Sequence, residues 1–260
     1  MKKNLFAFFL IICFVFVCLF NYSNKVGAHD LWINMSHHYI PVGGEAIAYL
    51  GWGHSYPFSP FLNTERLEKM NLIDPAGKIH SLSPKSENPG IEIKVDKEGT
   101  YLVTAELKSG YHTKTTTGYT SKSKKDSKDV IYSSWSEKFA KAIFAGGSTG
   151  SDSFKKQVGH SIEIIPLSDP GMLHEGDMLP VKILFKGKPL SKVFVYGTYV
   201  GFSTERAFAY TVMADNNGIA KIKMIKSGIW QIMAMHSHSA PDLTECDEYK
   251  YVTFLTFEVK

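Results

Sequence analysis

The chain has 260 residues, a formal net charge of +4, and 44% hydrophobic and 21% charged residues. This is the composition of a globular protein and excludes a disordered one. The first 28 residues have the three parts of a secretory signal peptide: a basic start, an apolar run over residues 5–20 and a short polar tail. We expect cleavage after Ala28 and a periplasmic or secreted mature protein of 232 residues.

The mature chain excludes several classes of protein. The leader carries three lysines and no acid, so its removal lowers the net charge to +1 and leaves no electrostatic basis for binding nucleic acid. Cys246, the one remaining cysteine, can form neither an internal disulfide nor a thiolate zinc site. No later apolar stretch reaches the roughly 18 residues that span a bilayer, so we expect no stable membrane insertion after cleavage. Retention of the leader as an anchor, or as a lipoprotein signal at Cys18, stays open.

Short segments rich in Val, Ile, Tyr and Phe, several of which alternate apolar and polar residues, predict β-strands. In chain order they cover residues 45–50, 91–95, 101–107, 161–166, 179–185, 192–199, 207–214, 220–224, 229–236 and 251–259. Turn sequences such as Asp74-Pro75-Ala76-Gly77 separate them. Strands at this spacing indicate antiparallel β-sandwich architecture.

The middle of the chain has a different pattern. Residues 113–128 are mostly Thr, Ser and Lys, too polar to bury, and predict a surface loop. Apolar residues then recur every four positions from Ile131 to Ile143, which predicts a helix over 131–145.

The expected fold class is therefore mainly β, with two antiparallel β-sandwich-like domains. The N-terminal domain would cover residues 29–155 and contain the polar loop and one inserted helix. The C-terminal sandwich would cover residues 156–260.

Histidine is the unusual feature: all ten lie after the leader, which is roughly twice the usual share for a chain of this length. Cleavage after Ala28 would make His29 the first residue, so that its α-amine and imidazole could chelate one metal ion. Their pKa values, near 7.7–8.0 and about 6.5, allow a metal to displace the protons near neutral pH. Nitrogen-rich sites of this kind suit Cu(II) and Ni(II). The alternative is that the cleavage site leaves a histidine there by chance.

Three further histidines are candidate ligands. His236 and His238 end a predicted strand, where residues i and i+2 share a face about 6–7 Å apart; the alternative is a solvated polar strand end. His54 lies between Gly53 and Ser55, where glycines allow a close approach of the backbone, and the alternative is an ordinary turn histidine. His112 and Cys246 are open as additional ligands.

Signatures of catalysis are absent from the sequence. It contains no nucleophile elbow, no glycine-rich phosphate loop and no HExxH motif. The sequence therefore offers no candidate catalytic residues.

Several short motifs, in order, carry a family resemblance: Ala28-His29-Asp30-Leu31-Trp32, Gly53-His54, Gly159–Leu167, Gly176-Asp177, Val181–Leu190, Ala214-Asp215 with Gly218, and Gly228-Ile229-Trp230. Together they resemble the DUF4198 proteins, which are exported and described as periplasmic components linked to nickel or cobalt uptake. The resemblance implies a two-part β-rich protein, the second part similar to an immunoglobulin or transthyretin sandwich. It also implies binding rather than catalysis, so we expect that the protein is not an enzyme. It extends to His29 and His54, although the usual Gly-His-Pro is here Gly-His-Ser.

The leading hypothesis is an exported divalent-metal-binding protein that supplies Ni²⁺ or Co²⁺, with Cu²⁺ possible, to a membrane metal transporter. Its ligands would be His29, His54, His236 and His238. A second hypothesis is a copper enzyme that oxidises polysaccharides through a two-histidine brace. A third is a metal-free adhesin or carbohydrate-binding sandwich whose exposed aromatic residues stack on sugars, with the candidates Trp32, Trp52 and Tyr56.

Overall fold

The structure is a computed structural model that describes residues 29–58, 60, 62–84 and 90–260. The predicted signal peptide and its cleavage site lie outside the described residues. In the described part of the chain, no helix is long and apolar enough to cross a membrane.

The elements are almost all strands, and each of the ten predicted strands overlaps an observed one. In chain order the strands are β1 (Asp30–Met35), β2 (Tyr39–Ile40), β3 (Glu45–Gly53), β4 (Leu67–Ile73), β5 (Ile79–Ser81), β6 (Gly90–Lys94), β7 (Gly99–Leu107), β8 (Gly110–Thr115), β9 (Gly118–Thr120), β10 (Val130–Gly146), β11 (Ile162–Pro166), β12 (Met178–Phe185), β13 (Lys188–Pro189), β14 (Phe194–Tyr199), β15 (Tyr210–Met213), β16 (Ile219–Lys223), β17 (Gly228–Ser239) and β18 (Glu248–Val259). Short 3-10 turns occur at Thr64–Arg66, Asp152–Lys155 and Pro170–Met172.

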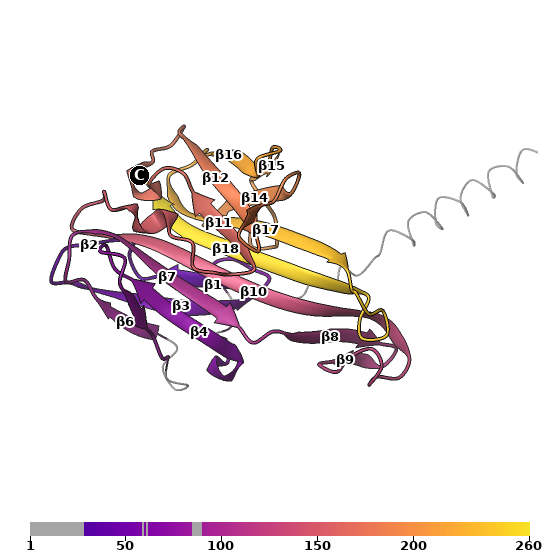
Figure 1. The fold of residues 1–260 in the computed structure, drawn as a ribbon. Helices are drawn as coiled ribbons and strands as arrows, with labels where there is room; N and C mark the ends of the chain where they lie inside the picture. Colours follow the sequence, from indigo (N-terminus) through magenta and orange to yellow (C-terminus); the bar gives the residue numbers. More distant parts are fainter. Residues whose placement is uncertain (1–28, 59, 61, 85–89) are drawn as a thin grey trace, which may run out of the picture.

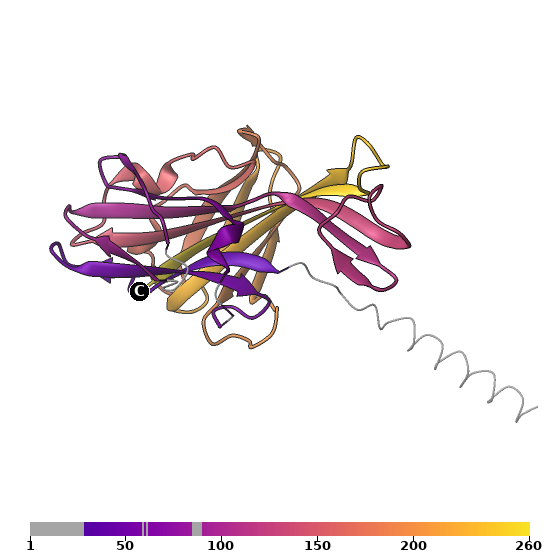
Figure 2. The ribbon, with the colours of Figure 1, turned by 90° about the horizontal axis from the view of Figure 1, so that it is seen from below.

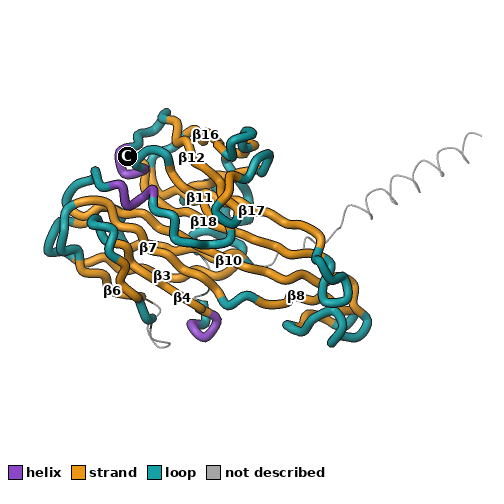
Figure 3. Tube along the Cα trace, in the orientation of Figure 1, coloured by secondary structure: helices purple, strands orange, loops and turns teal. Residues whose placement is uncertain are grey.

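One large sheet runs through the molecule, in the order β15-β14-β17-β18-β10-β7-β4-β5 (Figures 1 and 3). A three-stranded sheet, β1-β3-β6, covers one face, and a sheet made of β11, β12, β13 and β16 covers the other. The long strands β10 and β18 pair in parallel, whereas β17 and β18 are antiparallel. The β8–β9 hairpin and the turn between β17 and β18 extend from one end (Figures 1 and 2).

The predicted helix over 131–145 is wrong, because residues Val130–Gly146 form β10, the longest strand. An interval of four residues also repeats on one face of a strand, since strand side chains alternate with a period of two. The polar segment 113–128 differs as well: it begins in β8 and contains β9. The rest of this segment, residues 116–117 and 121–128, lies outside the strands.

Both faces of the large sheet are buried, which makes the structure a layered β-sandwich. Phe139 and Ile143 of β10 belong to the hydrophobic cluster under β11, β12 and β16. Ala140 and Phe144, the alternate residues, belong to the cluster under β1, β3 and β6. One sheet therefore contributes to two cores, and the division of the chain at about residue 155 stays a prediction.

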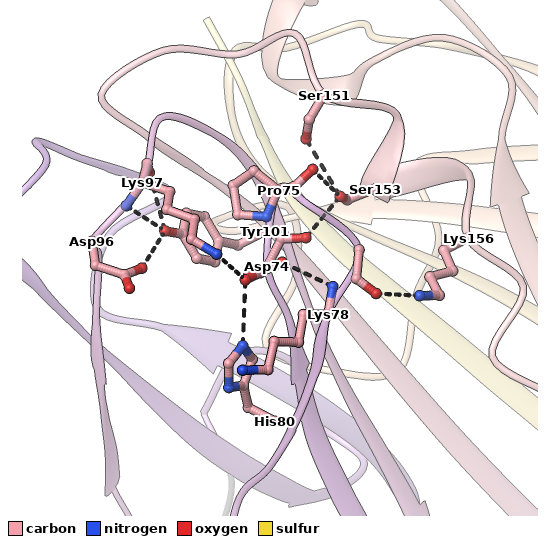
Figure 4. A network of polar contacts seen from close by, with 11 residues as sticks. Asp74, Pro75, Lys78, His80, Asp96, Lys97, Tyr101, Ser151, Ser153 and Lys156 are labelled. Atoms are coloured by element: carbon pink, nitrogen blue, oxygen red, sulfur yellow. Dashed lines mark hydrogen bonds and ion pairs between the residues drawn. The ribbon is translucent and has the colours of Figure 1, made fainter.

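A network of polar contacts around Asp74 fixes the turn between β4 and β5, which the sequence predicted (Figure 4). The Asp74 carboxylate accepts hydrogen bonds from Lys97 Nζ at 2.6 Å, from the Lys78 amide at 2.9 Å and from His80 Nε2 at 3.4 Å. Ser153 Oγ donates to the Asp74 carbonyl oxygen at 2.9 Å. Burial raises the pKa of Asp74, but these hydrogen bonds outweigh it and lower the pKa to about 2.

Candidate metal centre

His29 and His54 lie side by side at the ends of two paired strands. Antiparallel pairing of β1 with β3 sets Asp30 opposite Gly53, so the residue before Asp30 meets the residue after Gly53. The two imidazole rings are 4.7 Å apart between centroids and tilted by 60°. Both side chains are exposed. The sequence predicted both residues as ligands, and the register of these strands brings them together.

Two contacts hold this end of β1 in place. Arg206 binds the buried Asp30 carboxylate through two nitrogens, at 2.8 and 3.1 Å. The indole of Trp32 packs against β3 at Gly51, where a Cβ atom would be 2.2 Å from the indole nitrogen. The absence of a side chain at Gly51 therefore makes room for Trp32. Asp30 is engaged by Arg206, which leaves the imidazoles of His29 and His54 as the donors at this strand end.

His236 and His238 form a second pair near the end of β17. Their rings are 5.9 Å apart, as the i, i+2 spacing predicted, and both lie against Phe185 and Tyr251. His238 Nδ1 donates to the Ser239 carbonyl oxygen at 2.9 Å, which leaves Nε2 as the nitrogen able to bind a metal. Burial, and then the neighbouring His238, lower the pKa of His236.

The two pairs lie on opposite faces of the large sheet. His236 pairs with Tyr251, whereas Met235, one residue earlier, pairs with Val252 and through it with Lys138. Laterally paired residues share a face, and neighbours along a strand do not. Lys138 Nζ lies 5.0 Å from the ring of Trp52, which contacts His29. The structure therefore does not bring the four predicted ligands to one ion.

The two residues left open as additional ligands lie in different surroundings. His112 on β8 stacks on Tyr119 with 4.9 Å between the centroids, and its buried Nε2 has no hydrogen-bond partner in the part of the chain that the structure describes. Cys246 is a buried free thiol whose pKa is raised by burial. In the described ranges, no three His, Cys, Asp or Glu side chains form a group that could hold a metal ion. A metal at either histidine pair would therefore need a donor of another kind.

A cavity of about 460 Å³ opens beside His29, between Trp52 and the β8–β9 hairpin. Its lining includes Arg66, Lys138 and His112. Burial, followed by the charges of His54, Lys138 and Arg66, lowers the pKa of His29. Burial likewise lowers the pKa of Lys138 to about 8. Sequence reasoning missed Arg66 and Lys138, because no local motif marks Arg66 and Lys138 lies inside the predicted helix over 131–145.

The aromatic residues proposed to stack on sugars are mostly inaccessible. Trp32 is 1% exposed and Tyr56 is 8% exposed, and their rings pack against each other at 5.8 Å. Trp52 is half-buried and lines the cavity. Of the three, only Trp52 is therefore placed to meet a ligand.

The fold and these sites define a mainly β protein of several sheets with paired surface histidines. Residues 26–238 match the family model described as "Domain of unknown function (DUF4198)", and the chain belongs to this family. A search of curated proteins found no match.

Solved structures give only distant likenesses. The D0-D1 domain of intimin is 13% identical, with 87% of this chain and 97% of that chain covered and a TM-score of 0.23. An Escherichia coli alpha-2-macroglobulin is 10% identical, with 90% and 20% covered and a TM-score of 0.24. The Yersinia pseudotuberculosis adhesin InvE is 11% identical, with 89% and 59% covered and a TM-score of 0.22. Similarity this low carries no argument about function.

Proposed function

We propose that the protein is an exported binding protein for a divalent transition metal, nickel or cobalt, that supplies a membrane uptake system. The observation that carries this proposal is the pair of exposed imidazoles at His29 and His54, 4.7 Å apart between centroids. Neutral imidazole is the commonest nitrogen ligand of such metals. An exposed site also allows the metal to leave again, as delivery to a transporter requires.

The third donor in this proposal is the α-amine of His29. Cleavage after Ala28 would place it within the same residue as one of the two imidazoles. The ion would then have three nitrogen ligands, with the remaining positions open to water or another ligand. Such a set suits Ni(II) and Cu(II), which accept square-planar or tetragonal geometry.

His236 and His238 are proposed as a second, independent site. Their rings are half-buried among Phe185, Tyr249 and Tyr251. They lie on the other face of the large sheet from His29 and its proposed α-amine, and they offer two imidazole donors. We therefore expect this pair to bind more weakly than the His29 pair and to bind independently of it.

The test is metal titration of protein that begins at His29, with the N-terminus verified by mass spectrometry. We expect Ni²⁺ or Co²⁺ to bind tighter than about 10 μM, which corresponds to roughly −7 kcal/mol. His29→Ala and His54→Ala should each weaken this binding at least tenfold. A variant with one glycine before His29 keeps both imidazoles and displaces the amine, and should lose affinity to a similar extent.

His236→Ala/His238→Ala is the matched control, because it also removes imidazoles but on the other face of the sheet. It should leave the tight site unchanged. The proposal is overturned if neither Ni²⁺ nor Co²⁺ binds tighter than about 10 μM, or if His29→Ala binds as the unaltered protein does.

A copper enzyme that oxidises polysaccharides is the second candidate. The cavity beside His29, lined by Trp52, Tyr111 and Tyr119, is the observation that favours it, because a substrate could reach a metal there. Copper-loaded protein with a reductant, oxygen and oligosaccharides should then yield oxidised sugars, detected by mass spectrometry. Their absence would exclude this candidate.

A further inference from the structure

The cavity beside His29 is strongly basic. Three cationic side chains line it, Arg66, Lys108 and Lys138, together with His29 and His112. No acidic residue occurs in its lining among the residues that the structure describes. Its volume of about 460 Å³ lies within the range of small-molecule sites, about 300–1,000 Å³. A bare divalent cation would meet like charges in this cavity.

Lys138 is a buried cation in the lining of this cavity. It is 9% exposed, and within the described ranges no carboxylate forms an ion pair with it. Lys141, on the same strand, provides the contrast: it is also buried, and its Nζ lies 2.6 Å from a carboxylate oxygen of Glu163. A buried charge without a partner is costly. Lys138 therefore lacks the compensation that the fold gives to Lys141.

The acid near Lys138 is Asp30, and Arg206 already binds it through two hydrogen bonds. Trp52 holds the two cations in position, because Arg66 lies 4.6 Å and Lys138 lies 5.0 Å from its ring centroid. The side chains that line this cavity therefore carry positive charge, and no acidic residue among those described lies in the lining to neutralise it.

His112 is a second, independent sign of a missing partner. Its Nε2 is buried and has no hydrogen-bond partner among the described residues. The ring is fixed by its stacking on Tyr119 at 4.9 Å. Buried polar atoms in native proteins normally have partners, so two residues of the same lining, Lys138 and His112, each carry a polar group without an ion pair or hydrogen bond to the described residues.

We propose that this cavity binds a small organic anion with two or three carboxylates, held by Lys138, Arg66 and His112. Arg66 offers the forked donors that match a carboxylate, and Lys138 offers a point charge. A carboxylate at His29 would also be close enough to share the metal ion bound there. That last step rests on the proposed function, whereas binding of the anion itself does not.

The experiment titrates metal-free protein that begins at His29 with tricarballylate, a tricarboxylate that chelates metals weakly. It follows the heat of binding and the intrinsic tryptophan fluorescence, to which Trp52 in the cavity contributes. Citrate, inorganic phosphate and sulfate are separate arms. We expect saturable binding of both tricarboxylates at least tenfold tighter than of phosphate or sulfate. Lys138→Met should weaken tricarboxylate binding at least tenfold, and Arg66→Gln should also weaken it.

Lys221→Met is the matched control, because Lys221 is an exposed lysine on β16 and the change in net charge is the same. It should bind like the unaltered protein. Lys138→Met should also melt at a higher temperature than the unaltered protein in the absence of anion, since it removes a buried unpaired charge. This readout shows that the variant is folded and tests the argument about Lys138 separately.

The outcomes separate this inference from the proposed function. Tricarboxylate binding that depends on Lys138 supports the inference even if no metal binds. Tight Ni²⁺ binding without any binding of tricarboxylate overturns the inference and leaves the proposed function intact. Equal binding of phosphate and tricarboxylate, or citrate binding only with Ni²⁺ and unaffected by Lys138→Met, also overturns it.

Discussion

The buried ion pair between Lys141 and Glu163 joins the large sheet to β11. Lys141 Nζ lies 2.6 Å from Glu163 Oε2, and the two side chains are 2% and 4% exposed. The Glu163 carboxylate also accepts hydrogen bonds from the amides of Val158 and Gly159, at 3.1 and 2.8 Å. Burial lowers the pKa of Lys141, and Glu163 opposes that shift. Removing Glu163 and removing Lys141 should therefore lower the free energy of unfolding by different amounts.

Glu163→Gln keeps the shape of the side chain and leaves the Lys141 charge uncompensated. Loss of one partner of a buried pair costs about 3–5 kcal/mol of unfolding free energy. With a urea dependence of about 3 kcal/mol per M, the unfolding midpoint should fall by about 1–1.7 M. Lys141→Met should lower the free energy of unfolding by less, because the Glu163 carboxylate keeps its hydrogen bonds from the amides of Val158 and Gly159. The double variant Lys141→Met/Glu163→Leu should be within about 1 kcal/mol of the unaltered protein, or more stable.

The pH dependence of Glu163→Gln provides a second measurement. With a lowered pKa in the folded state, Lys141 binds fewer protons there than in the unfolded chain, where its pKa is about 10.4. Stability should therefore rise with pH below the unfolded-state pKa of about 10.4, by up to about 1.4 kcal/mol per pH unit. The unaltered protein should show a smaller slope. A loss below about 1 kcal/mol, or a double variant as unstable as Glu163→Gln, would refute this reasoning.

Two further predictions concern acid and packing. Burial lowers the pKa of His38 to about 4 and that of His160 to about 3, so below pH 6.5 the unfolded chain takes up protons that the folded protein does not. Urea midpoints should fall from pH 6.5 to pH 4, and less steeply for His160→Phe; equal slopes would contradict this. Gly51→Ala should lower the free energy of unfolding by more than about 3 kcal/mol, because the new Cβ would be 2.2 Å from the indole of Trp32. Gly110→Ala is the control: its Cβ would have no atom within 4 Å, so this variant should unfold nearly as the unaltered protein does.

The sequence predicted ten of the eighteen strands in the described residues, and β1, β4, β8 and β10 are among those that it missed. Apolar residues at intervals of four share a face both in a helix and in a strand, so the spacing from Ile131 to Ile143 did not distinguish them. The discriminating signal is the nearly continuous apolar run over residues 139–145. Such a run indicates a strand buried on both faces, as the two hydrophobic clusters confirm.

The candidate site was predictable to the extent that it depends on local geometry. The neighbouring positions of His236 and His238 follow from a period of two along one strand. The contact of His29 with His54 depends on the register of β1 and β3, which no local pattern specifies. The separation of the two pairs depends on the order of strands in the large sheet. The importance of Lys138 can be recognised only in the structure, where no carboxylate of the described residues forms an ion pair with it.

The double burial of β10 also limits how this protein can change. A single inserted residue near Lys141 would turn every following side chain of the strand to the other face. Phe144 would then be directed into the core that holds Ile143, and Ile143 into the core that holds Phe144. Loss or gain of two residues preserves the faces. Relatives of this chain should therefore differ in length through this strand by even numbers, and by any number in the loops beyond it.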